Sequence, residues 1–79
     1  MPQVFREDGW VASFYSNEGT EPIHVHMRKG AGEAKFWVSP GVALAASEAL
    51  KVKQLAEAEA LVEKHAEAIV RKWNEYFAN

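Results

Sequence analysis

The stretch Ile23-His24-Val25-His26-Met27-Arg28 alternates apolar and polar side chains, a pattern typical of a β-strand with one buried face. Because successive strand residues point to opposite sides of a sheet, His24 and His26 share one side, whereas Val25 lies on the other. The stretch therefore predicts a sheet with an apolar side that needs a cover and a polar side that carries two imidazoles.

Further strands are expected before and after this stretch. Residues 4–6 and 10–16 form the arms of a hairpin around Asp8-Gly9, a dipeptide typical of tight two-residue turns. Residues 33–38 form a fourth strand after a glycine-containing turn. Residues 42–46 suit either a short fifth strand or the beginning of a helix, and we favour the strand.

In the second half of the chain, apolar residues no longer recur every second position and follow the spacing of a helix instead. Apolar residues repeat every seven positions at Leu55, Val62, Ile69 and Tyr76, within a segment rich in Ala, Glu, Lys and Leu. This pattern predicts one long helix over residues 52–77. Its apolar stripe is the only cover available for the apolar side of the sheet.

These elements predict an α+β fold in a single domain over residues 1–79. An antiparallel sheet of four strands, or five with the ambiguous segment, occupies residues 3–46. One long C-terminal helix packs on one of its faces.

Composition restricts the class of protein. The 79 residues include no cysteine, so no disulfide and no thiolate zinc site can form. Nine basic and eleven acidic residues give a net charge of −2, which does not favour general attraction to nucleic acid. No apolar run approaches the ~20 residues that a membrane-spanning helix needs. We expect a cytoplasmic protein with no cofactor and no membrane association.

The polar side of the sheet is the candidate functional surface. An aromatic and Arg-bearing surface without a cover resembles the core of a protein interface. This favours a protein-interaction or regulatory module that binds a partner protein or a second copy of itself. The binding residues would be Tyr15, Arg28, Glu33 and Trp37.

Catalysis is the alternative, and the sequence does not decide whether the protein is an enzyme. His24 and His26 would act as general base and general acid, and Lys35 would stabilise developing negative charge, as in metal-independent cleavage of RNA. RNA could also bind without cleavage by stacking on Tyr15 and Trp37.

Metal binding is a weaker alternative for the two histidines. Their spacing suits a divalent transition metal, with Glu18, Glu21 or Glu33 as further ligands. A closed site needs about four ligands, and local geometry fixes only two here, so we predict no metal. The plainest interpretation is that the histidines hydrogen-bond Tyr15 and the loop at residues 17–22.

Several segments together resemble a bacterial family of small proteins, Domain of Unknown Function family 4160. They are Val4-Phe5-Arg6, Phe14-Tyr15-Ser16-Asn17-Glu18-Gly19, Glu21-Pro22, His24-Val25-His26, Gly32-Glu33-Ala34-Lys35-Phe36-Trp37 and Trp73-Asn74-Glu75-Tyr76-Phe77. Members of the family are often encoded beside another small protein, so the resemblance implies a toxin–antitoxin-like pair with the neighbouring gene product as partner. The chain departs from the family around Leu50-Lys51-Val52-Lys53, where members commonly carry a glycine and then a Ser-Pro-type helix start.

Overall fold

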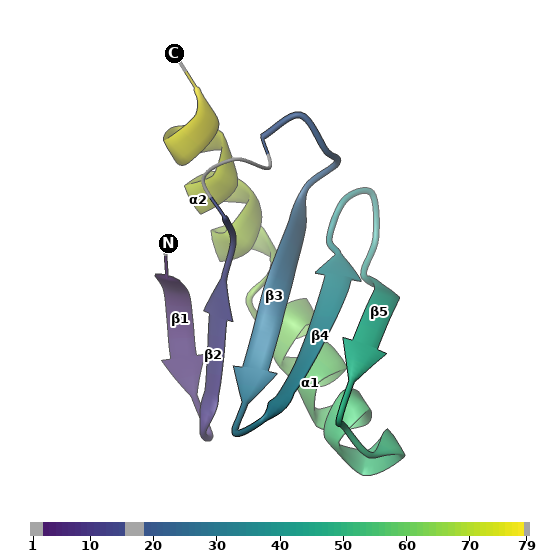
Figure 1. Cartoon of the computed structure of the whole chain (residues 1–79). Helices are drawn as coiled ribbons and strands as arrows, with labels where there is room; N and C mark the ends of the chain where they lie inside the picture. The colour runs from purple at the N-terminus through teal and green to yellow at the C-terminus, as the bar shows by residue number, and fades with distance from the viewer. Residues whose placement is uncertain (1–2, 16–18, 79) are drawn as a thin grey trace.

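Among the residues that the structure describes, five antiparallel strands and two helices make up the fold (Figure 1). The computed structural model describes residues 3–15 and 19–78. The strands lie in chain order across one sheet: β1 (Gln3–Glu7), β2 (Trp10–Ser13), β3 (His24–Lys29), β4 (Gly32–Trp37) and β5 (Ala43–Glu48). Two helices, α1 (Val52–Lys64) and α2 (Ala66–Phe77), lie across one face of the sheet (Figure 1). The α+β class and the antiparallel sheet are confirmed, and the fifth strand is present.

The first hairpin forms at the predicted turn. Asp8 and Gly9 both have positive φ, 54° and 83°, which two-residue hairpin turns require and which Asp and Gly tolerate. Glu7 pairs with Trp10 on the two sides of this turn. The sequence therefore sets this turn through local backbone preferences alone.

The apolar core lies between the sheet and the helices. Val25, Met27 and Phe36 have no exposed surface and belong to the same cluster as Val62 and Ile69 of the helices. The apolar side chains that alternate along β3 and β4 thus pack in one layer with those that repeat every seven residues in the helices.

The prediction of one long helix is wrong, because the helical segment divides at His65 into α1 and α2. Neither proline nor glycine occurs here, and hydrogen bonds from His65 N to Leu61 O and from Ile69 N to His65 O continue across the division. The His65 side chain instead makes tertiary contacts, which a helical repeat cannot reveal. No helix in the described part of the chain is long and apolar enough to cross a membrane.

Glu7 ties the first strand to the junction of the two helices. Its carboxylate accepts hydrogen bonds from Lys64 Nζ at 2.7 Å and His65 Nε2 at 2.8 Å. The His65 ring also stacks on Phe5, with 4.1 Å between ring centroids. The hydrogen bond from Lys64, and secondly that from His65, hold the pKa of Glu7 below its ordinary value.

Replacing the central core residue should weaken the domain severely. Phe36→Ala removes a side chain with no exposed surface and leaves a cavity, so we expect a loss of about 3 kcal/mol in the free energy of unfolding. Urea denaturation followed by circular dichroism measures this loss. Phe36→Leu should cost clearly less, and equal stability of wild type and Phe36→Ala would contradict the assigned core.

The contact at Glu7 predicts a dependence of stability on pH. Because the folded-state pKa of Glu7 is lowered, its contribution is present above the ordinary Glu pKa and disappears as the pH falls through the lowered value. Glu7→Gln should therefore reduce the loss of Tm between neutral and acid pH. Glu63→Gln, an exposed change on α1, is the matched control, and an unchanged pH profile in Glu7→Gln would refute the prediction.

Candidate functional site

The register of β3 and β4 brings most of the predicted site residues onto one face. His24 lies opposite Trp37, His26 opposite Lys35, and Arg28 opposite Glu33. Residues directly opposite each other in an antiparallel pair share a face. Tyr15 joins them from the segment after β2, since its ring lies 4.3 Å from the ring of His26. The structure therefore assembles the predicted set on one side of the sheet, opposite to the side that carries Val25 and Phe36.

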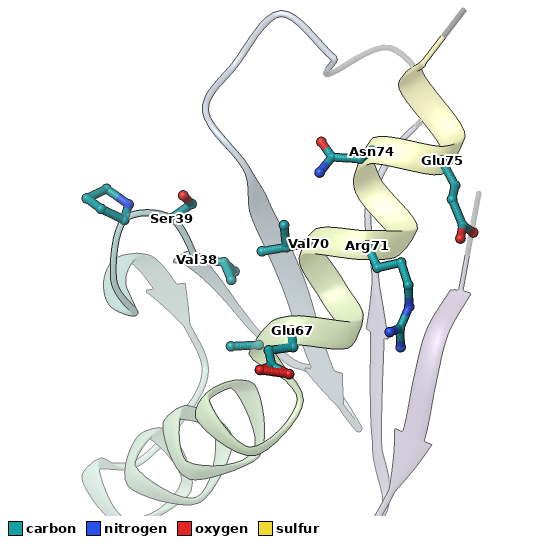
Figure 2. Close-up of a pocket in the computed structure, with 9 residues that line it drawn as sticks. Val38, Ser39, Glu67, Val70, Arg71, Asn74 and Glu75 are labelled. Atoms are coloured by element: carbon teal, nitrogen blue, oxygen red, sulfur yellow. The ribbon is translucent and has the colours of Figure 1, made fainter.

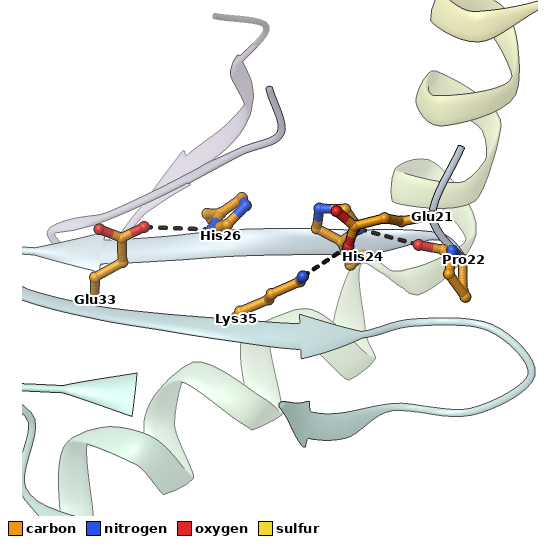
Figure 3. Close-up of polar contacts among 6 residues, drawn as sticks. All are labelled: Glu21, Pro22, His24, His26, Glu33 and Lys35. Carbon is orange, nitrogen blue, oxygen red and sulfur yellow. Dashed lines mark hydrogen bonds and ion pairs between the residues drawn. The ribbon is translucent and has the colours of Figure 1, made fainter. Parts of the chain in front are cut away.

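His24 is buried rather than exposed, which corrects the expectation of an open surface. It has no exposed surface, and its Nδ1 lies 3.0 Å from the carbonyl oxygen of Pro22, an acceptor to which it must donate (Figure 3). Its ring lies 5.7 Å from Trp37 and 5.0 Å from Trp73 of α2, edge-on in both cases. Contacts from the preceding loop and from α2 thus enclose the imidazole.

His26 belongs to a second polar group on the same face. Its Nδ1 lies 3.3 Å from Oε2 of Glu33 (Figure 3), and the hydroxyl of Tyr15 donates to the same oxygen at 3.3 Å. His26 is 9% exposed and its ring lies 5.2 Å from that of His24. Glu33 therefore holds His26 and Tyr15 together.

Lys35 and Arg28 differ in how they are held. Lys35 Nζ donates to Oε1 of Glu21 at 2.8 Å and lies 4.6 Å from the centre of the Trp37 ring (Figure 3). Arg28 is exposed and makes no ion pair with any residue that the structure describes. Lys35 is thus fixed by two contacts, whereas Arg28 extends into solvent.

The chemistry of this face is limited by the burial of His24. A fully enclosed imidazole cannot touch a substrate, so His26 and Lys35 are the predicted catalytic residues that remain within reach of solvent. Within residues 3–15 and 19–78, no three His, Asp or Glu side chains lie close enough to hold a metal ion. Glu18, named above as a possible ligand, lies outside the described residues.

Two hollows border β5 on the polar side of the sheet. One has a volume of about 300 Å³ and is lined by His26, Ala31, Glu33, Ala34, Lys35, Ala46, Ser47 and Glu48. The other, of about 520 Å³, is lined by Pro22, Trp37, Ser39, Pro40, Gly41, Val42 and Ala43. The first hollow thus connects the His26 group with the end of β5.

A further hollow of about 620 Å³ lies between α2 and the segment after β4 (Figure 2). Val38 and Val70 face one another across it, and Glu67, Arg71, Asn74 and Glu75 border it. None of the predicted site residues lines this hollow.

The full exposure of β5 is the feature that sequence reasoning missed, although the strand itself was favoured. All six of its residues are exposed, and Leu44, at 45%, is one of the few large apolar side chains that reach solvent. The signal was present in the run Val42-Ala43-Leu44-Ala45-Ala46, which is apolar and uncharged yet lacks the alternation of a covered strand.

Comparison with known proteins identifies the family. The model of a domain of unknown function, DUF4160, matches residues 9–74, which is more than half of the chain. The chain therefore belongs to the DUF4160 family, as its sequence motifs predicted. No match was found among curated proteins or among solved structures.

Burial of His24 predicts that this residue stabilises the fold. His24→Ala removes the hydrogen bond to Pro22 and the ring contacts with Trp37 and Trp73, so we expect a loss of roughly 2 kcal/mol. Thermal and urea unfolding measure it. The control Arg28→Ala, on the same strand but exposed, should change stability by less than about 0.5 kcal/mol. Equal stabilities of the two variants would show that His24 is not structural.

Proposed function

We propose that this member of the DUF4160 family is a protein-interaction module that binds its partner by adding a strand to the β5 edge of its sheet. The observation that carries this proposal is the unpaired outer edge of β5. It is the last strand of the sheet and pairs with β4 alone, so no other described strand uses the backbone groups along its outer side. Unpaired N–H and C=O groups on an edge strand are a template for pairing with another chain.

The two edges of the sheet differ in how they are protected. At the opposite edge, β1 carries Arg6 and Glu7, and Glu7 is bonded to the helix junction. In contrast, β5 contains neither proline nor lysine, and its only charged residue is Glu48. Natural edge strands usually carry such charges or prolines as a defence against unwanted pairing. Their scarcity in β5 is consistent with an edge that is used for binding.

The partner in this proposal is the product of the neighbouring gene, as the family resemblance suggests. In such a toxin–antitoxin-like pair, the module would act as a regulatory component in a bacterial cytoplasm. Strand addition suits this role because the main-chain hydrogen bonds give affinity without requiring a deep pocket.

A second candidate function, cleavage of RNA without a metal, is favoured by one observation. His26 is positioned by Glu33 and lines a hollow of about 300 Å³ together with Lys35. An imidazole oriented by a carboxylate is a suitable general base, and the ammonium group could stabilise a developing charge. His24 would then support His26 rather than act on the substrate. If His26→Ala and Lys35→Ala cleave RNA and arrest growth as wild type does, this candidate is wrong.

Complex formation with the neighbouring gene product tests the interaction function. Ala45 is skipped in the register of β4 and β5, so Ala45→Pro removes a backbone N–H and adds a ring at this edge without replacing a residue of a registered pair. We expect binding at least tenfold weaker in Ala45→Pro, measured by size-exclusion chromatography with light scattering and by titration. Ala45→Val, which keeps the N–H, is the matched control and should bind as wild type does.

Two outcomes would refute the interaction function. One is a wild-type monomer that ignores the neighbouring product. The other is full affinity in Ala45→Pro with a Tm close to that of wild type. A similar Tm in both variants at position 45 shows that a loss of binding does not arise from unfolding.

A further inference from the structure

We infer that the strand accepted by β5 belongs to a different protein and carries a basic side chain followed, four residues later, by a large apolar side chain. This inference rests on the strand addition proposed above and concerns what the edge selects. It follows from the two hollows that border β5 and from the charges in one of them.

The side chains of β4 and β5 form a step on the polar side of the sheet. Trp37 lies opposite Ala43 and Lys35 opposite Ala46, so large side chains on β4 adjoin alanines on β5. Side chains of a strand added beside β5 would therefore meet little obstruction above the two alanines. They can lean over β5 toward β4, where the hollows lie.

The hollow at the beginning of β5 suits an apolar side chain. Trp37, Pro40 and Val42 are among the residues that line its volume of about 520 Å³, and Ala43 forms its border on β5. No Asp, Glu, Lys or Arg is among its lining residues in the described chain. An aliphatic or aromatic side chain opposite Ala43 would bury apolar surface there.

The hollow at the end of β5 suits a cation. Glu33 and Glu48 lie directly opposite each other and both line it, and like charges in this position repel. The Glu33 side chain is 41% exposed, and Glu48 makes no ion pair within the described residues. Lys35, the cation that lines this hollow, is already bonded to Glu21, and Arg28, opposite Glu33 on β3, does not line it. A lysine or arginine opposite Glu48 would therefore complement two carboxylates.

The register of β4 gives the spacing and the order of the two side chains. Glu33 lies opposite Glu48 and Trp37 opposite Ala43, so two positions that are four residues apart on β4 face the two ends of β5. Ala43 and Glu48 are five residues apart on β5, and the bulge at Ala45 reduces this span to four residues on β4. A strand that pairs antiparallel with β5 and passes the bulge as β4 does runs in the direction of β4. It reaches Glu48 first and Ala43 four residues later, with the basic residue on the N-terminal side of the apolar one.

A second copy of β5 does not meet these requirements. Antiparallel pairing about an axis between Ala45 and Ala46 places the partner's Glu48 beside Ala43, at the apolar hollow. The strand Ala43–Glu48 contains no lysine or arginine, so it supplies no cation for Glu33 and Glu48. The edge therefore favours a partner with a different sequence over self-association.

Four synthetic peptides test this selection. Each is an extended, threonine- and valine-rich decapeptide with a fluorescent label, and they carry Lys/Leu, Glu/Leu, Lys/Ser or Glu/Ser at positions four residues apart. At low salt, fluorescence anisotropy should show the Lys/Leu peptide binding at least tenfold more tightly than the Glu/Leu and Lys/Ser peptides. Glu48→Lys should reverse the preference between Lys/Leu and Glu/Leu. Glu63→Lys, an exposed change on α1, should leave that preference unchanged.

Three results with the peptides would overturn the inference. They are equal binding of all four peptides, binding of none, and a Lys/Leu preference that persists in Glu48→Lys. A dimer of the protein alone that Ala45→Pro dissociates would also overturn it, because the occupant would then be a second copy. If the peptides fail while the complex with the neighbouring product depends on Ala45, the selection is wrong and the proposed function stands.

Discussion

Packing of the sheet against the two helices is the contact on which the rest of the structure depends. Val25 and Phe36 meet Val62 and Ile69 in a layer from which water is excluded. Hydrophobic burial is the main favourable contribution in so small a domain, and only one side of the sheet can provide it on this scale. The opposite side must therefore be organised by other kinds of contact.

That opposite side is organised by a polar and aromatic network. Glu33 gathers Tyr15 and His26, while His24 is held by Pro22 and by the edge of Trp73. Enclosing polar rings is favourable only if their nitrogens find partners, and no buried side-chain nitrogen or oxygen among the described residues is left without one. The two histidines accordingly differ: His24 is enclosed, whereas His26 lines a hollow.

The position of the helices also leaves the two edges of the sheet unequal. Glu7 attaches β1 to Lys64 and His65, so that edge is charged and tied to the helices. At the other edge β5 pairs with β4, and all six of its residues are exposed. The same chain thus has one protected edge and one edge whose backbone can accept another strand. The interaction function proposed for the protein follows from this difference.

The sequence by itself determined where most strands lie along the chain, the Asp8-Gly9 turn, the apolar and polar faces and the helical half of the chain. These depend on side-chain alternation, on the helical period and on local backbone preferences, all of which can be read from neighbouring residues. Only the tertiary structure decided the division at His65, the burial of His24 and the exposure of β5. His65 bonds to Glu7, 58 residues away, and His24 meets Trp73 of the second helix. Which side chain is covered depends on such distant contacts, and local patterns fix the direction of a side chain without fixing what it meets.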